Sequence, residues 1–184
     1  MKISEWEPVL ALLVSPKRDH IRGPLAAPVS LVEYGDYECP YCGGAQPIID
    51  EIQQQMGEAL QFVFRNFPLA MIYPHAEMAA EATEAAGVQG KFWDMHHLLY
   101  SRQDRLDFVV LTEYAEAVGL DTVRFRDDLE AHAFAGKVAE DFMSGVRSGV
   151  NGTPSLLHQR TAPPWDFNNL LGALQNAAAA RKAA

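Results

Sequence analysis

The stretch E33YGDYECPYCGGAQP47 contains both cysteines of the chain, separated by two residues. An apolar run precedes it, and a Cys-x-x-Cys placed after a strand favours a redox-active pair. Half of a metal site and two buried core cysteines are the alternative interpretations. The rest of the sequence has to decide between them.

The segments on both sides of the cysteines predict a β-α-β unit. P28VSLVEY34 is apolar and β-branched and is bounded by turn residues, so we expect a buried strand. Pro40 suits the first position of a helix because it has no N–H to satisfy, and this helix is expected to run to Met56, where Gly57 ends it. A second strand follows in L60QFVFRNFP68, which is rich in aromatic and β-branched residues.

The following part of the chain, from residue 74 to about 149, repeats apolar residues at spacings of three and four, which predicts a block of helices. Asp121 is a good N-cap for one of them. A short strand, S155LLH158, then follows the turn G152TP154, and a last helix is expected over 166–175. This order predicts an α/β fold with a helical insertion.

Composition limits the functions that need to be considered. A chain of 184 residues with 48% hydrophobic residues can bury a core as one domain, and its net charge of -9 disfavours nucleic acid and anionic membrane surfaces as partners. The apolar stretch from Val9 to Val14 is short for a signal peptide, so we interpret the segment 1–20 as an amphipathic helix and expect a cytoplasmic protein. No run approaches the roughly 18 apolar residues of a spanning helix.

The predicted helix start gives the two cysteines different roles. Unpaired N–H groups and the helix dipole stabilise an anion at the first turn, so Cys39 is expected to be the more acidic, attacking thiol. Cys42 lies one turn further in and is expected to be the buried resolving thiol. Asp36 and Glu38 bring negative charge near Cys39 and should raise its pKa again in part.

Glu33 interrupts the apolar strand six residues before the first cysteine. If its carboxyl group is buried, desolvation raises its pKa, and the group could exchange protons with Cys42. The alternative is that Glu33 lies on an exposed face of the strand.

The histidines do not complete a metal site with the cysteines. Zinc needs about four ligands, and the chain has no second Cys-x-x-Cys. His96 and His97 are adjacent in a predicted helix and point in different directions. The other candidates, His75, His132 and His158, are scattered. We therefore expect no metal.

Four segments in order, V32EYGDYECPYCGGAQP47, F62VFRNFPL69, H75AEMAAEATEAAGVQGKFWDMHHLLY100 and S144GVRSGVNGTPSLL157, resemble the DsbA-like branch of the thioredoxin superfamily. The resemblance implies one DsbA-like domain over 1–184, with a thioredoxin-like core at about 26–70 and 150–180 and a helical insertion at about 74–149. It also implies thiol–disulfide oxidoreductase activity.

Carried over residue by residue, the resemblance makes Cys39 the nucleophile and Cys42 the resolving cysteine. Pro154 matches the family's cis-proline, and Thr153 before it is expected to contact a bound substrate peptide. Glu33 matches the buried acidic position of the first strand, which favours the proton-relay role.

Two further features bear on the substrate. The dipeptide Pro40-Tyr41 between the cysteines resembles that of glutaredoxins, and we expect it to contact the substrate. Relatives follow the cis-proline strand with a glycine-containing hairpin, whereas H158QRTAPPWD166 is short and contains two prolines, so the last strand pair is expected to be truncated or distorted.

The sequence therefore predicts a cytoplasmic enzyme that exchanges disulfides with protein or small-thiol substrates and needs no organic cofactor, with glutathione a possible co-substrate. Two alternatives remain open. One is a glutathione-dependent transferase or isomerase on the same fold, for which a Cys42 substitution would leave activity intact. The other is a peptide-binding module that keeps its cellular function without either cysteine.

Overall fold

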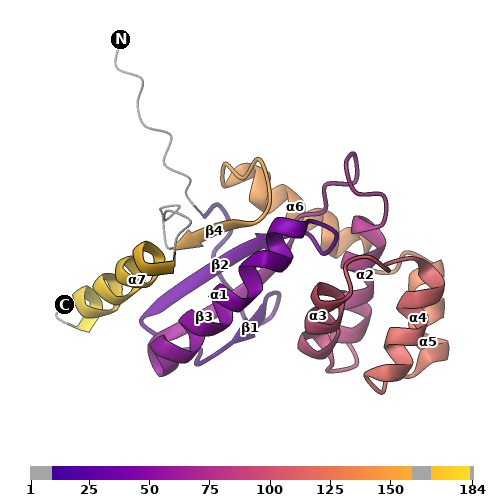
Figure 1. The fold of residues 1–184 in the computed structure, drawn as a ribbon, viewed down its shortest axis with the longest axis horizontal. Coiled ribbons are helices and arrows are strands. Elements are labelled where there is room, and N and C mark those ends of the chain that lie inside the picture. Colours follow the sequence, from indigo (N-terminus) through magenta and orange to yellow (C-terminus); the bar gives the residue numbers. More distant parts are fainter. Residues whose placement is uncertain (1–9, 159–166, 183–184) are drawn as a thin grey trace, which may run out of the picture. The chain divides into compact units, whose positions relative to one another are not determined.

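The computed structural model describes residues 10–158 and 167–182. The helices and strands are labelled in Figure 1, and in chain order they are β1 (His20–Arg22), β2 (Val29–Gly35), α1 (Pro40–Met56), the 3-10 turn η1 (Gly57–Ala59), β3 (Leu60–Asn66), α2 (Ala76–Gly87), α3 (Phe92–Ser101), α4 (Phe108–Ala117), α5 (Thr122–Glu130), α6 (Ala135–Arg147), β4 (Ser155–His158) and α7 (Phe167–Lys182). The fold is α/β, as the sequence predicts.

Two compact units divide the described chain. The first contains residues 10–34, 45–65, 143–158 and 167–182, and the second contains 35–44 and 66–142. Two of the four boundaries fall inside α1 and α6, so each of these helices contributes residues to both units, and the other two assign the last residues of β2 and β3 to the second unit. The cysteine-bearing segment 35–44 belongs with the helical unit.

The first unit is built on a four-stranded sheet with the order β1-β3-β2-β4. The edge strand β1 pairs antiparallel with β3, with His20 opposite Phe64. On the other side β4 pairs antiparallel with β2, which sets Ser155 opposite Tyr34 and Leu156 opposite Glu33. The neighbours β2 and β3 are joined through α1, which confirms the predicted β-α-β unit.

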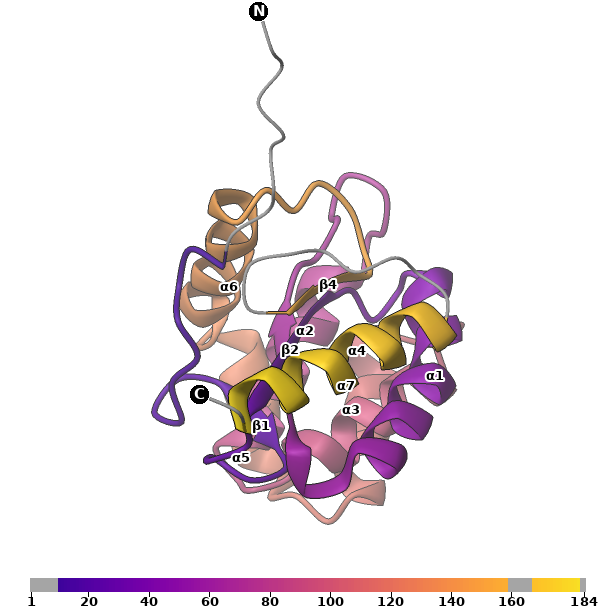
Figure 2. The ribbon, with the colours of Figure 1, turned by 90° about the vertical axis from the view of Figure 1, so that its left-hand side faces the viewer.

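Apolar side chains on α1 and α7 belong to the core of this unit. Figure 2 shows α7 on the viewer's side of β2, with α1 to the right of the strand. Their buried residues recur at spacings of three and four, which places them on one face of each helix. These residues are Ile49, Ile52 and Met56 on α1 and Leu170, Leu174 and Ala178 on α7.

The second unit is a helical bundle in which α2 contacts α3, α4 and α5. Buried alanines along α2, among them Ala79, Ala82 and Ala86, have little volume and let the neighbouring helices approach closely. The predicted N-cap Asp121 is confirmed, because its side chain accepts from the backbone N–H groups of Val123 and Arg124.

The N-terminal prediction is wrong where the structure can test it. Residues 10–19 form bends and a turn instead of a helix, and Leu13 is 78% exposed. The Asp19 carboxylate accepts from the Ser15 N–H at 2.8 Å, a local bond that stabilises the turn. The strand β1 that follows was not predicted, and the segment 159–166, where a distorted strand pair is expected, lies outside the described residues.

Candidate functional site

The two cysteines lie at the start of α1. Cys39 directly precedes the helix, and its carbonyl oxygen accepts from the N–H groups of Cys42 at 3.1 Å and Gly43 at 3.3 Å. Both cysteines are buried, with 1% and 0% of their surface exposed, whereas Pro40 is exposed and Tyr41 is 77% exposed. The helical turn thus presents the Pro-Tyr dipeptide to solvent and turns the two cysteines inward.

Asp36 is a buried carboxyl group next to the pair. Its backbone N–H donates to Cys42 Sγ at 3.4 Å, and its carboxylate accepts from the N–H groups of Leu69 at 2.7 Å and Glu38 at 2.8 Å. Burial raises the Asp36 pKa from 3.8 to about 6, because desolvation outweighs these two hydrogen bonds; the charges of Cys39 and Glu38 add to the increase. Asp36 therefore gains its charge near neutral pH.

Gln103, in the connection between α3 and α4, holds the backbone of the cysteine segment. Its side-chain Nε2 donates to the carbonyl oxygens of Tyr37 and Cys39, both at 2.8 Å. The sequence gives no sign of this role for Gln103, because 64 positions separate it from Cys39 and one glutamine in a loop forms no pattern.

Glu38 binds the residue that precedes α2. One carboxylate oxygen accepts from the His75 N–H at 2.7 Å, and the other lies 2.9 Å from His75 Nδ1. From sequence, Glu38 is only a negative charge near the thiols and His75 only a scattered histidine. In the structure the two residues connect the cysteine segment to the segment before α2.

Glu33 is 0% exposed in β2, so the alternative of an exposed strand face is wrong. The side-chain amide of Gln46 donates towards both carboxylate oxygens, each at 3.3 Å. A buried carboxyl group can accept and release a proton. Its role in proton transfer with Cys42 stays a prediction.

Thr153 and Pro154 directly precede β4, and the peptide bond between them is cis. The next residue, Ser155, lies opposite Tyr34 in the register of the sheet. The two residues are thus at the end of the sheet where β2 finishes and β4 begins. Their contact with a substrate peptide stays a prediction.

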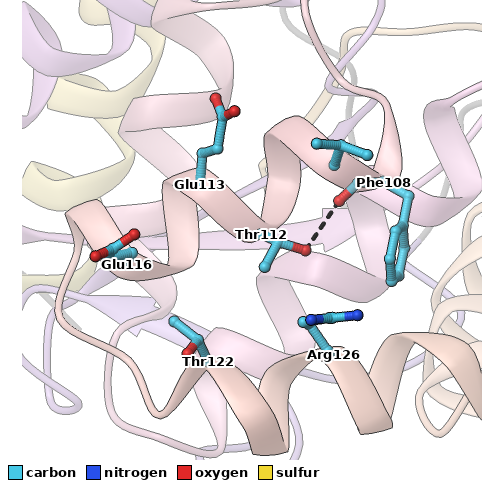
Figure 3. A pocket seen from close by; sticks show the side chains of 7 residues that line it. Phe108, Thr112, Glu113, Glu116, Thr122 and Arg126 are labelled. Atoms are coloured by element: carbon cyan, nitrogen blue, oxygen red, sulfur yellow. Dashed lines mark hydrogen bonds between the residues drawn. The ribbon is translucent and has the colours of Figure 1, made fainter.

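A surface pocket of about 360 Å³ lies between α4 and α5. Figure 3 shows Glu113, Glu116 and Arg126 around it, together with Thr112, whose hydroxyl donates to the Phe108 carbonyl oxygen at 3.0 Å. None of the residues predicted from sequence to carry chemistry lines this pocket.

Two kinds of feature are absent from the part of the chain that the structure describes. Residues 10–158 and 167–182 contain no group of three or more His, Cys, Asp or Glu side chains placed to hold a metal ion. Within the same ranges, no helix combines the length and the apolar character needed to cross a lipid bilayer.

Comparison with known families and structures gives a consistent fold. The family model described as thioredoxin matches residues 15–174. The oxidised BdbD of Bacillus subtilis is 23% identical with a TM-score of 0.79, covering 90% of this chain and 95% of that one. A thioredoxin-like oxidoreductase from Silicibacter pomeroyi is 27% identical with a TM-score of 0.77, covering 92% and 95%. Wolbachia pipientis alpha-DsbA1 reaches a TM-score of 0.80 at 16% identity, covering 94% and 96%.

The curated proteins that are similar to this chain in sequence are named Na(+)/H(+) antiporters. The chain is 43% identical to Na(+)/H(+) antiporter NhaA 3 of Salinispora tropica over 94% of its own length and 27% of the antiporter. It is 42% identical to Na(+)/H(+) antiporter NhaA 1 of Mycolicibacterium vanbaalenii over 95% of its length and 30% of that protein. The chain thus spans less than a third of these relatives.

Proposed function

Because this chain belongs to the thioredoxin family and has a DsbA-like fold, we propose that it is a thiol–disulfide oxidoreductase whose reactive pair is Cys39 and Cys42. The observation that carries the proposal is the position of the pair on this fold. Cys39 stands immediately before α1, and Cys42 lies one turn inside it, where its sulfur accepts from the Asp36 N–H.

The position of Cys39 favours its thiolate. The first N–H groups of a helix have no intrahelical partner, and together with the helix dipole they stabilise negative charge. Since the thiolate is the nucleophile in exchange, this sulfur is the one expected to attack. Pro40 and Tyr41 are exposed beside it and are proposed to contact the substrate.

The exchange proceeds in two steps. The Cys39 thiolate attacks one sulfur of a substrate disulfide, the substrate S–S bond breaks, and the other substrate sulfur leaves as a thiolate that takes up a proton. Cys42 then loses its proton and attacks Cys39 in the mixed disulfide, which releases the second substrate thiol. Two electrons pass from the cysteine pair to the substrate, and the reverse sequence oxidises a substrate dithiol.

Three further residues complete the proposal. Glu33 is proposed to exchange the proton of Cys42, and Thr153 with Pro154 to hold the substrate strand in an extended conformation. Protein thiols and small thiols, glutathione included, are the proposed substrates. A cytoplasmic location is part of the proposal and is tested by fractionating the source cells.

The experiment that tests this function equilibrates the purified protein across glutathione redox buffers and reads both cysteines by alkylation and mass spectrometry. We expect one reversible two-electron transition between a dithiol and a Cys39–Cys42 disulfide. Two variants serve as matched controls: Cys42→Ser should accumulate a mixed disulfide at Cys39, whereas Cys39→Ser should accumulate none. If no intramolecular disulfide forms at any buffer potential, the proposal is wrong.

A second candidate function follows from the curated relatives. Since regions similar to this chain lie within proteins named Na(+)/H(+) antiporters, the chain is a candidate redox module that acts on the thiols of such an antiporter. The Cys42→Ser variant, expressed in the source cells, should then form a mixed disulfide with an antiporter polypeptide, identified by mass spectrometry. If the Cys42→Ser variant forms mixed disulfides only with proteins other than the antiporter, this role is wrong.

A further inference from the structure

The peptide group between Gly35 and Asp36 is held at both ends within the second unit. Its carbonyl oxygen, on Gly35, accepts from the Phe67 N–H at 2.8 Å. Its N–H, on Asp36, donates to Cys42 Sγ at 3.4 Å. The C=O and N–H bonds of a planar trans peptide point in opposite directions, so the bond from Phe67 also sets the direction of the Asp36 N–H. Phe67 is itself buried and stacks on Phe142, with ring centroids 4.3 Å apart.

The Asp36 side chain fixes the same stretch of backbone from its other side. One carboxylate oxygen accepts from the Glu38 N–H at 2.8 Å, and the other accepts from the Leu69 N–H at 2.7 Å. A carboxylate that bonds the N–H two residues ahead forms an Asx turn, which constrains the backbone of the residue that carries it. Asp36 is only 1% exposed, so these bonds are shielded from competing water.

We propose that this Asx turn makes Asp36 a positioning residue for the resolving cysteine, because it aims the Asp36 N–H at Cys42 Sγ and so stabilises the Cys42 thiolate. The inference rests on the proposed function. A backbone N–H aimed at a sulfur favours the form in which that sulfur carries negative charge. The bond that the Gly35 carbonyl accepts polarises the N–H of the same peptide group and strengthens the effect.

Negative charge develops on Cys42 when the disulfide of the pair opens. A thiolate of a substrate or reductant attacks the Cys39 sulfur, the Cys39–Cys42 bond breaks, and its electron pair stays on Cys42, whose thiolate then takes up a proton. A better stabilised thiolate leaves faster. In the reverse direction, the same N–H raises the fraction of Cys42 that is ionised and ready to attack a mixed disulfide.

The charge of the Asp36 carboxylate opposes the effect of its N–H. Burial raises the Asp36 pKa from 3.8 to about 6, so above this pH the carboxylate is charged and repels a thiolate beside it. Cys39 and Glu38 bring further negative charge to the same place. A test of the inference must therefore separate the turn from the charge.

Two variants of Asp36 make this separation. Asp36→Asn and Asp36→Ala both lack the charge, but asparagine keeps an acceptor oxygen for the Glu38 N–H and alanine has none. In single-turnover experiments, we expect dithiothreitol to reduce the oxidised pair about tenfold more slowly in Asp36→Ala than in Asp36→Asn. In a Cys39→Ser background, the Cys42 pKa, measured from the ultraviolet absorbance of the thiolate, should be about one unit higher with the alanine than with the asparagine.

Asp121→Ala is the matched control, because it removes side-chain bonds of the same kind at the start of α5. It should leave the reduction rate and the Cys42 pKa at their wild-type values. Equal reduction rates in the two Asp36 variants would overturn the inference while the proposed function stands. If the wild-type pair shows no two-electron transition in glutathione buffers, the proposed function itself fails.

A second measurement needs no substitution of Asp36. In Cys39→Ser, Cys42 is the one cysteine left to ionise, and the amide proton resonance of Asp36 should move downfield as it does so. This change should be missing when Cys42→Ala is added. If the Asp36 amide does not respond to the ionisation of Cys42, its N–H does not stabilise the thiolate and the inference is wrong.

Discussion

The guanidinium of Arg65 and the carboxylate of Asp19 form a two-pronged ion pair in which neither side chain is exposed. Nε and Nη2 of Arg65 donate to the two carboxylate oxygens at 3.0 and 3.1 Å, and Nη1 donates to the Tyr34 hydroxyl at 2.8 Å. Arg65 is in β3, and Asp19 immediately precedes β1. The pair therefore fixes the edge strand to the sheet.

Asp19→Asn should destabilise the protein strongly, because it leaves the buried Arg65 charge without its partner. A buried ion pair broken on one side costs about 3–5 kcal/mol, and urea unfolding measures the loss. Glu130→Gln is the matched control, because it breaks the exposed pair that Glu130 makes with Arg126, and it should cost less than about 1 kcal/mol. Equal losses of unfolding free energy in Asp19→Asn and Glu130→Gln would contradict a stabilising role for the buried Asp19–Arg65 pair.

Gly43→Ala should disturb the anchor of the cysteine segment. A Cβ at Gly43 would collide with the side-chain amide of Gln103 and displace it from the carbonyl oxygens of Tyr37 and Cys39. Gly44→Ala, in the same turn, meets no atom within 4 Å, so it should stabilise the helix by about 0.5–1 kcal/mol. We expect Gly43→Ala to be less stable than wild type by urea unfolding.

A double-mutant cycle separates this collision from other effects of the alanine. In a Gln103→Ala background the obstacle is gone, so Gly43→Ala should become neutral or stabilising, as Gly44→Ala is in wild type. If the losses of unfolding free energy from Gly43→Ala and Gln103→Ala add up in the double variant, the alanine at position 43 does not act through Gln103.

Asp36 should make the stability of the protein depend on pH. Its pKa is about 6 in the folded protein against an ordinary value of 3.8, so between these pH values the folded state binds more protons than the unfolded state. The free energy of unfolding then falls as pH rises through this window. The asparagine of Asp36→Asn does not ionise. The amount by which the free energy of unfolding of Asp36→Asn falls below that of wild type should therefore shrink by about 1–3 kcal/mol over the same pH range.

Urea unfolding at a series of pH values from about 4 to 7 measures this change, since the window follows from the two Asp36 pKa values. Asp127→Asn, at an exposed position on α5, is the control and should run parallel to wild type. If the free energy of unfolding of Asp36→Asn lies below that of wild type by the same amount at every pH, the pKa of Asp36 is not raised by folding.

Glu33→Gln tests the proton relay without changing the shape of the side chain. If Glu33 exchanges the Cys42 proton, the reduction of the oxidised pair by dithiothreitol should slow by about tenfold or more in single-turnover experiments, with an altered pH profile. Alkylation of Cys39 should keep its wild-type rate, because Glu33 is proposed to exchange a proton with Cys42 and not with Cys39. An unchanged reduction rate and pH profile would leave Glu33 a structural residue.

Much of the fold is predictable because it depends on local chemistry. Pro40 and Gly57 fix the ends of α1, and the Asp121 side chain satisfies the first N–H groups of α5. The predicted last helix, 166–175, is observed to continue to Lys182, because the alanine-rich end has high helix propensity.

The remaining features depend on partners that are distant in sequence. The turn at 10–19 replaces the predicted helix because Asp19 binds both Ser15 and Arg65, and Arg65 lies 46 positions away. The cysteine pair is visible from its spacing alone, but Gln103 reaches it only in the folded chain. A sequence pattern cannot indicate contacts of this kind, because no local periodicity produces them.

The anchors on the segment 36–39 have a consequence for the entropy of the reaction. Gln103, Leu69 and His75 immobilise its backbone and side chains before any substrate arrives. Ordering one backbone residue costs roughly 1–2 kcal/mol, and here that loss occurs during folding. A mixed disulfide at Cys39 therefore forms on a prearranged surface, and the disorder lost in that step comes mainly from the substrate chain.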